Sequence, residues 1–199
     1  MGVINNLLEV DMKKILVIML AALIAFGGFT KTRHLGNYSY INTDGPINIA
    51  VNAVVAVKFN KKAYLPFILY LGGDKGVNAT IDRNSVVMEY KGKTYHLPSY
   101  REWRKNYNED VYDLSLFSKE PEHIFPSEMD IYRFQTNVDF FPARNEGTTV
   151  SNVLSITYRI GAVTKVYFKN PGVKKGDVVK IKVFDRDNPK IYGEVEIKF

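Results

Sequence analysis

Short runs in which apolar and polar residues alternate cover much of this chain, and their spacing limits the folds it can adopt. The residues from Ile47 to Phe59 alternate, those from Tyr64 to Leu71 are almost all apolar, and those from Val178 to Phe184 alternate again. A period of two residues predicts β-strands with one buried face. The turns between neighbouring runs are too short to hold the helix of a parallel crossover, which excludes parallel α/β folds.

Roughly nine predicted strands follow one another at the spacing of an antiparallel sandwich. Ser85–Tyr90 and Thr94–Leu97 predict a hairpin, because Gly92 between them can adopt the positive φ of a tight turn. Further strands are expected at residues 77–81, 113–117, 131–134, 153–160, 163–168 and 191–199. The predicted fold is all-β, an antiparallel β-sandwich of immunoglobulin-like architecture over residues 47–199, with one short helix.

That helix is predicted from Tyr100 to about Tyr107. Ser99 and Glu102 are spaced as a capping box, in which the serine hydroxyl accepts a free N–H of the first helical turn. The helix is short, so packing rather than intrinsic propensity must stabilise it.

Four aromatic residues gather at this helix. Tyr100, Trp103 and Tyr107 fall on one helical face at spacings of three and four, and Tyr112 follows nearby. Clusters of this kind can anchor a binding partner. They can equally belong to a hydrophobic core, which the shared helical face favours. The four residues are therefore a candidate interaction site with a structural alternative.

Residues 12–27 resemble a segment for export. Lys13 and Lys14 precede an apolar run from Ile15 to Phe26, and Ala25 and Gly27 supply small residues for cleavage. The run is shorter than the ~20 apolar residues of a membrane-spanning helix.

Three interpretations of this segment remain open. We expect a cleaved signal peptide, with an uncleaved signal-anchor through residues 13–27 as the alternative, and a buried core helix as the third interpretation. Residues 1–27 are then an N-terminal extension plus signal peptide or signal-anchor, and residues 28–46, which are mostly polar, are a linker. The expected location is secreted, periplasmic or cell-surface, or anchored by the uncleaved N-terminal helix.

The composition excludes several chemistries. The 199 residues include no cysteine, which rules out disulfides, thiol catalysis and thiolate metal sites. The net charge of +6 is modest and spread along the chain, which favours an ordinary soluble surface with slightly more lysine than glutamate. The alternative is a basic face that meets anionic lipid headgroups or acidic wall polymers. Nucleic acid is not an expected partner, because export argues against it and a half-buried sheet needs Tyr/Lys alternation in any case.

A candidate metal site lies in one predicted turn. Asp185, Asp187 and Asn188 bring three oxygen-bearing side chains together, and calcium prefers six or more oxygen ligands, usually from several loops. The runs Val183–Asp187 and Gly193–Ile197 locally resemble the last calcium-binding loop of C2 domains. We expect no cofactor, and calcium is the alternative that this resemblance implies. An Asp-rich hairpin turn explains the same residues without a metal.

Hydrolytic chemistry has weaker support. Glycoside hydrolysis requires two facing carboxyl groups, and the candidates are Glu89, Glu102, Asp130 and Asp139. The three histidines, His34, His96 and His123, are not accompanied by a Gly-x-Ser-x-Gly motif.

These observations favour a non-enzymatic protein. We expect an exported or membrane-tethered envelope protein that binds or assembles with an unknown envelope protein or polymer. An ion- or small-ligand-binding module with calcium at Asp185–Asn188 is the alternative, and a wall-directed hydrolase comes third.

Overall fold

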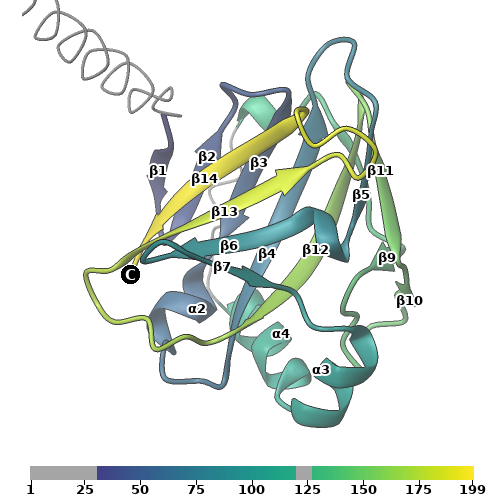
Figure 1. The fold of residues 1–199 in the computed structure, drawn as a ribbon. Helices are drawn as coiled ribbons and strands as arrows, with labels where there is room; N and C mark the ends of the chain where they lie inside the picture. Colours follow the sequence, from purple (N-terminus) through teal and green to yellow (C-terminus); the bar gives the residue numbers. More distant parts are fainter. Residues whose placement is uncertain (1–30, 120–126) are drawn as a thin grey trace, which may run out of the picture. The chain divides into compact units, whose positions relative to one another are not determined.

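The computed structural model describes residues 31–119 and 127–199, and Lys31–Phe199 form one compact unit (Figure 1). The predicted export segment and His123 lie outside the described residues. Within them the fold is mostly β, with several antiparallel sheets and a few short helices. No helix in this part of the chain is long and apolar enough to cross a membrane.

The larger sheet has six strands. In spatial order they are β1 (Arg33–Gly36), β2 (Ser39–Asn42), β3 (Ile47–Asn52), β4 (Tyr64–Gly73), β12 (Ile160–Lys169) and β8 (Arg133–Gln135). All neighbours are antiparallel except β8, which runs parallel to the start of β12.

The second sheet has four antiparallel strands. They are β14 (Tyr192–Lys198), β13 (Val178–Phe184), β6 (Val86–Tyr90) and β7 (Lys93–His96), in that order. Two further sheets have two strands each. Strand β5 (Ala79–Asp82) pairs with β11 (Val153–Ile156), and β9 (Val138–Asp139) pairs with β10 (Thr149–Val150).

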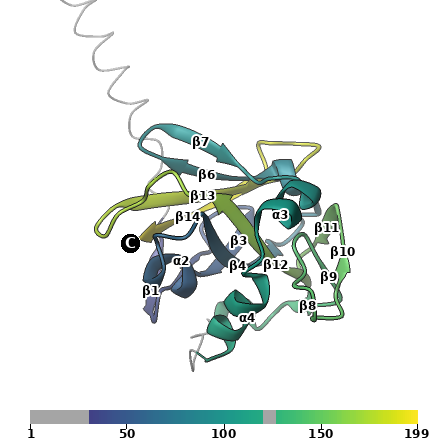
Figure 2. The ribbon, with the colours of Figure 1, turned by 90° about the horizontal axis from the view of Figure 1, so that it is seen from below.

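Short helices connect these strands. They are α2 (Val54–Lys58), α3 (Tyr100–Asn106) and α4 (Asp110–Lys119), with 3-10 turns at Arg83–Ser85 and Ser127–Met129. The four-stranded sheet lies across from β3 and β4, and α3 and α4 lie at one end of the sheets (Figures 1 and 2).

One hydrophobic core joins the two sheets. It includes Leu69 and Val166 from the larger sheet and Met88, Ile181 and Val195 from the smaller one. On β13 the buried and less buried residues alternate, as the period-two pattern predicted. Burial of one face of each sheet therefore supplies the main stabilising contribution.

The sheets meet at a corner where β14 faces β2, and we call this line of contact the β14 seam. Side chains, rather than another strand, occupy the open edge of β14 here. Three hydrogen bonds form it: Tyr40 Oη to the Lys198 carbonyl (2.9 Å), Asn42 Nδ2 to the Glu194 carbonyl (2.6 Å) and the Glu196 N–H to Thr32 Oγ1 (2.9 Å). Three backbone groups on this edge of β14 are therefore satisfied by side chains.

Glycine permits the closest approach at this corner. A Cβ on Gly193 would lie 1.9 Å from the carbonyl oxygen of Ile47, a distance that no real Cβ can occupy. Gly193 is thus required by backbone contact between β14 and β3 rather than by its φ angle.

Several local predictions are confirmed. The hairpin of β6 and β7 turns at Lys91 and Gly92, whose φ angles are 48° and 73°, as a tight primed turn requires. Helix α3 begins at Tyr100, and the Ser99 hydroxyl accepts the Glu102 N–H at 3.1 Å.

The prediction of one strand from Ile47 to Phe59 is wrong in its second half. Strand β3 ends at Asn52, whose side-chain oxygen accepts the Val54 N–H at 3.0 Å and turns the chain into α2. Residues 53–59 still fitted the alternating pattern of a strand, because most residues of α2 are apolar and an apolar residue falls at every second position.

Two further predictions are corrected. Residues 113–117 are helical within α4, whose buried positions include Asp110, Asp113 and Phe117, so a search for apolar alternation misread them. The single predicted helix is therefore accompanied by α2 and α4. The predicted linker at residues 28–46 contains β1 and β2, and Tyr40 and Ile41 in it are buried.

Replacing Gly193 should test the seam. We expect Gly193→Ala to lower the free energy of unfolding by about 3 kcal/mol, because the added methyl group forces β14 away from β3. Glu196→Ala, on the exposed face of the same strand, should change it by less than about 0.5 kcal/mol. Urea unfolding measures both values, and equal effects of the two substitutions would contradict the close approach.

Candidate functional site

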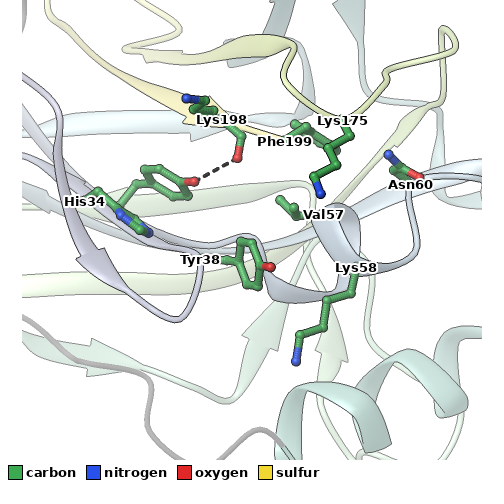
Figure 3. A pocket seen from close by; sticks show the side chains of 9 residues that line it. His34, Tyr38, Val57, Lys58, Asn60, Lys175, Lys198 and Phe199 are labelled. Atoms are coloured by element: carbon green, nitrogen blue, oxygen red, sulfur yellow. Dashed lines mark hydrogen bonds between the residues drawn. The ribbon is translucent and has the colours of Figure 1, made fainter.

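A pocket of about 590 Å³ opens beside the β14 seam (Figure 3). The β1–β2 hairpin contributes His34, Tyr38 and Tyr40 to its lining. Helix α2 and the turn after it contribute Val57, Lys58 and Asn60. The loop before β13 and the end of β14 contribute Lys175, Lys198 and Phe199. We call this the hairpin pocket.

An unusual turn places Tyr38 in the pocket. Gly36, Asn37 and Tyr38 have φ angles of 96°, 45° and 58°, so three consecutive residues adopt the left-handed region. Asparagine tolerates this region, whereas a bulky tyrosine is an outlier there and costs ~1–3 kcal/mol. The Tyr38 carbonyl accepts the Ala53 N–H at 2.9 Å, which ties the turn to the start of α2.

A second loop places Lys175. The Gly176 N–H donates to the Phe199 carbonyl at 2.6 Å, and the Phe199 N–H donates to the Asp177 carbonyl at 2.8 Å. Gly176 has a φ of 89°, which a residue with a side chain rarely adopts. These bonds fix the loop against the end of β14, so that Lys175 stands beside the pocket.

The lining is positively charged. Lys58, Lys175 and Lys198 line the pocket, together with His34, and no lining residue is acidic. In Figure 3 the Lys175 ammonium reaches toward Tyr38, while the Lys58 and Lys198 side chains point outward on different sides. An anion in the pocket would therefore meet the Lys175 ammonium directly, whereas Lys58 and Lys198 would contribute only attraction over a longer range.

Aromatic contacts build one wall. The rings of His34 and Tyr40 stack with centroids 4.8 Å apart. Burial raises the pKa of the Tyr40 hydroxyl, which donates a hydrogen bond to the Lys198 carbonyl. The hydroxyl therefore stays protonated at neutral pH and acts as a donor.

The lining of the hairpin pocket has groups suited to binding. Its side chains offer cations, aromatic faces and the Asn60 amide, and none of them carries a carboxylate or a thiol. Histidine, tyrosine and lysine are also residue types that can act as general acids or bases.

The predicted calcium residues have protein partners. Asp185 is buried and its Oδ1 accepts the Thr80 N–H at 2.8 Å. Asp187 pairs with Arg186 at 3.0 Å, and Asn188 Oδ1 accepts the Lys190 N–H at 3.3 Å. No group of three or more acidic, histidine or cysteine side chains that could hold a metal occurs in residues 31–119 and 127–199. Calcium binding stays a prediction.

The predicted aromatic site is divided by the fold. Trp103 and Tyr107 are buried, and Trp103 packs on Tyr167 with ring centroids 4.9 Å apart. Tyr100 is half-buried beside Trp103, whereas Tyr112 on α4 is 52% exposed. The core interpretation therefore holds for Trp103 and Tyr107, and Tyr112 alone presents most of its ring to solvent.

The carboxylates proposed for hydrolysis lie on different elements. Glu89 is on β6, Glu102 on α3, Asp130 after the second 3-10 turn and Asp139 on β9. Asp139 is buried and bound to Lys165, and none of the four lines the hairpin pocket. His96 is exposed on β7. Hydrolysis remains an untested prediction.

A separate group of buried charges lies beneath α3 and α4. Its three aspartates all have cationic partners. The contacts are Asp113 with Lys62, Asp110 with Arg104 (2.8 Å) and Asp139 with Lys165, which also binds Glu146 (2.6 Å). Such pairs cost desolvation energy and fix geometry more than they stabilise.

Two buried tyrosines belong to this region. Tyr107 Oη donates to Asp113 Oδ2 at 2.5 Å, whereas Tyr167 Oη has no hydrogen-bond partner among the described residues. Burial, with the nearby charge of Asp113, raises the pKa of both hydroxyls. The folded state holds these protons more tightly than the unfolded chain, so stability falls as the pH rises above ~10.

Sequence reasoning missed the hairpin pocket. His34, Tyr38 and Tyr40 lie in the predicted linker, and Lys175 lies just before the strand predicted at Val178–Phe184. Only the packing of β2 against β14 brings these segments together.

Comparisons with protein-family models, with curated proteins and with solved structures each found no match to this chain. The functional argument therefore depends on the geometry of the site.

Removing the Asp185 carboxylate should reveal its structural role. We expect Asp185→Ala to lower the free energy of unfolding by about 1–3 kcal/mol, because the Thr80 N–H loses its acceptor. Asp187→Ala, on the surface, should cost less than about 0.5 kcal/mol. Thermal unfolding with and without millimolar calcium measures both. A calcium-dependent rise in Tm that each substitution abolishes would instead establish a metal site.

The two buried tyrosines should respond in opposite ways. Tyr107→Phe should lower the free energy of unfolding by about 1.5–3 kcal/mol, because Asp113 loses a hydrogen bond to its charge. Tyr167→Phe should be neutral or stabilising, because it removes an unpaired buried hydroxyl. Denaturant unfolding of both variants tests this, and a comparable loss from Tyr167→Phe would show that its hydroxyl has a bonding partner.

Proposed function

We propose that this chain is an exported or membrane-tethered protein of the cell envelope with a non-enzymatic binding role, and that it holds an anionic group of its partner in the hairpin pocket. The domain would be an immunoglobulin-like β-sandwich in the broad sense of two facing antiparallel sheets. The observation that carries the proposal is the pocket lining, which has three lysines and a histidine and no acidic residue.

The electrostatics favour an anion over a neutral ligand. Two opposite unit charges 4 Å apart attract by about 4 kcal/mol at the effective dielectric constant of a protein surface. Acidic residues near the pocket are engaged elsewhere: Asp177 accepts the Tyr90 hydroxyl at 2.6 Å and the Lys174 N–H at 2.8 Å. Asp177 is thus held by Tyr90 and by the backbone of its own loop, and it does not line the pocket.

The ligand should also have an apolar or ring-shaped part. Val57, Phe199 and the ring of Tyr38 face the pocket between the cations (Figure 3). Its volume lies within the ~300–1,000 Å³ range of small-ligand sites. A bare inorganic ion would fill only part of that space, whereas an anionic group attached to a glycerol, sugar or side chain would use the apolar surface as well.

The location follows from the sequence. A basic segment, an apolar run and small residues at a cleavage position support export at residues 12–27, and the absence of cysteine fits an envelope protein that needs no disulfides. Acidic polymers and anionic surfaces are abundant partners in that compartment, which agrees with a cationic pocket.

Titration with a small phosphate ester tests the proposal. We expect glycerol 1-phosphate to shift the NMR amide signals of residues 34–40, 175 and 198 with a millimolar dissociation constant, whereas glycerol should not. Lys175→Gln with Lys198→Gln should weaken binding at least tenfold, because the pocket loses two of its cations.

Lys93→Gln with Lys190→Gln serves as the matched control, since these exposed lysines lie outside the pocket and the change in net charge is the same. The control pair should weaken binding less than twofold. If both pairs of substitutions weakened binding equally, the net charge of the protein rather than the pocket would explain the affinity. If the unaltered protein did not bind glycerol 1-phosphate, the proposal would be refuted.

A further inference from the structure

Two aromatic side chains extend the hairpin pocket onto an exposed surface. Phe59, between the lining residues Lys58 and Asn60, is 37% exposed, and Tyr112 on α4 is 52% exposed. Lys62 lies over both rings, 5.7 Å from the centroid of Phe59 and 5.0 Å from that of Tyr112. We call Phe59 and Tyr112 the aromatic pair.

The aromatic pair is held in place by buried charges. Lys62 binds Asp113, which is fully buried in α4, and Glu109 at 2.8 Å. These contacts hold α4 against the turn after α2 and thereby fix the positions of the Phe59 and Tyr112 rings. The aromatic pair differs from the other exposed apolar side chains in that one buried ion pair holds a lysine over both rings, next to residues that line the cationic pocket.

We propose that the hairpin pocket receives the phosphate of an anionic lipid headgroup while the aromatic pair enters the membrane interface. The proposal rests on the function proposed above and names the ligand of the same site. Tyrosine rings favour the headgroup level of a bilayer, where the ring is apolar and the hydroxyl remains hydrated. Lysines at the rim can extend their ammonium groups toward neighbouring headgroups.

The position of the pocket in the chain agrees with a lipid. Only a few residues separate the end of the apolar run at Gly27 from His34, the first lining residue. At ~3.4 Å per extended residue this connection spans at most ~25 Å. Where the N-terminal segment remains in the bilayer, headgroups would therefore be present at the high effective concentration of an intramolecular encounter.

A lipid also explains the combination of surfaces better than a free phosphate ester. A soluble ester needs the cations of the pocket but not the aromatic pair outside it. An anionic bilayer supplies a phosphate to Lys175 and an apolar interface to Phe59 and Tyr112 at the same time. The experiment must therefore distinguish the hairpin pocket from the aromatic pair, and a lipid headgroup from a soluble phosphate ester.

Chemical footprinting of the full chain in nanodiscs provides the test. The rates at which Lys175 and Lys198 are acetylated are measured in phosphatidylcholine nanodiscs and in nanodiscs with 30% phosphatidylglycerol. We expect both rates to fall at least fivefold in the anionic nanodiscs, with Lys93 and Lys190 as internal references that change less than twofold. Glycerol 1-phosphate at the same phosphate concentration, added to neutral nanodiscs, should protect much less.

Variants separate the aromatic pair from the pocket. Phe59→Ser with Tyr112→Ser should abolish at least half of the protection in anionic nanodiscs and leave the binding of glycerol 1-phosphate unchanged, which also shows that the domain is folded. Ile131→Ser with Tyr158→Ser removes two other exposed apolar side chains and should leave both readouts unchanged.

Each outcome decides the matter. Protection by anionic nanodiscs that depends on the aromatic pair supports the proposal. Equal protection by glycerol 1-phosphate, or equal rates in the two nanodiscs while the ester still binds, overturns the lipid assignment and leaves the proposed anion binding intact. The absence of protection by both ligands overturns the two proposals together.

Discussion

The open edge of β14 is the constraint on which the rest of the structure depends. An edge strand has a row of backbone groups that require partners, and here side chains of β2 and Thr32 supply them in place of a strand. Gly193 allows the backbones of β14 and β3 to approach, so the two sheets are held at one corner and share a core. The hairpin pocket is a consequence of this arrangement, because Tyr40 lines it and bonds the Lys198 carbonyl at the same time.

A side chain also completes the free edge of the larger sheet. Beyond Ala162, strand β12 has no strand partner on its outer side, and Asp139 takes that place. Its Oδ1 accepts the Lys165 N–H at 3.0 Å and the Thr164 hydroxyl at 2.8 Å. Helices α3 and α4 then cover this region, with Trp103 and Phe117 buried beneath them. Because the ion pairs here offset their own desolvation only in part, their main effect is to fix the position of α4, and with it the exposed ring of Tyr112.

The parts of the fold that sequence patterns predicted are those in which local signals agree. Strands β4 and β13, the hairpin of β6 and β7 and helix α3 each have a clear period, turn glycine or cap. Helix α2 was missed because a single side-chain bond from Asn52 ends a strand whose apolar pattern continues. Helix α4 was missed because its buried face contains Asp110 and Asp113, whose charges are paired by Arg104 from α3 and by the distant Lys62. The lysines of the hairpin pocket carry no local signal, since Lys58 ends a helix, Lys175 lies in a loop and Lys198 ends a strand, all places where lysine is common.

The backbone of Tyr38 links the fold to the proposed binding role. A two-residue turn with both φ angles positive is satisfied by Asn-Gly, and the asparagine is present at position 37. Glycine at position 38 would complete the turn without strain, so the turn itself does not require tyrosine. The ring instead lies in the hairpin pocket near the Lys175 ammonium (Figure 3). A strained residue persists only where surrounding contacts determine its conformation, and here the Ala53 N–H and the packing of the ring against the core do so. The conformational cost of Tyr38 is therefore balanced by contacts whose visible result is one aromatic wall of a cationic pocket.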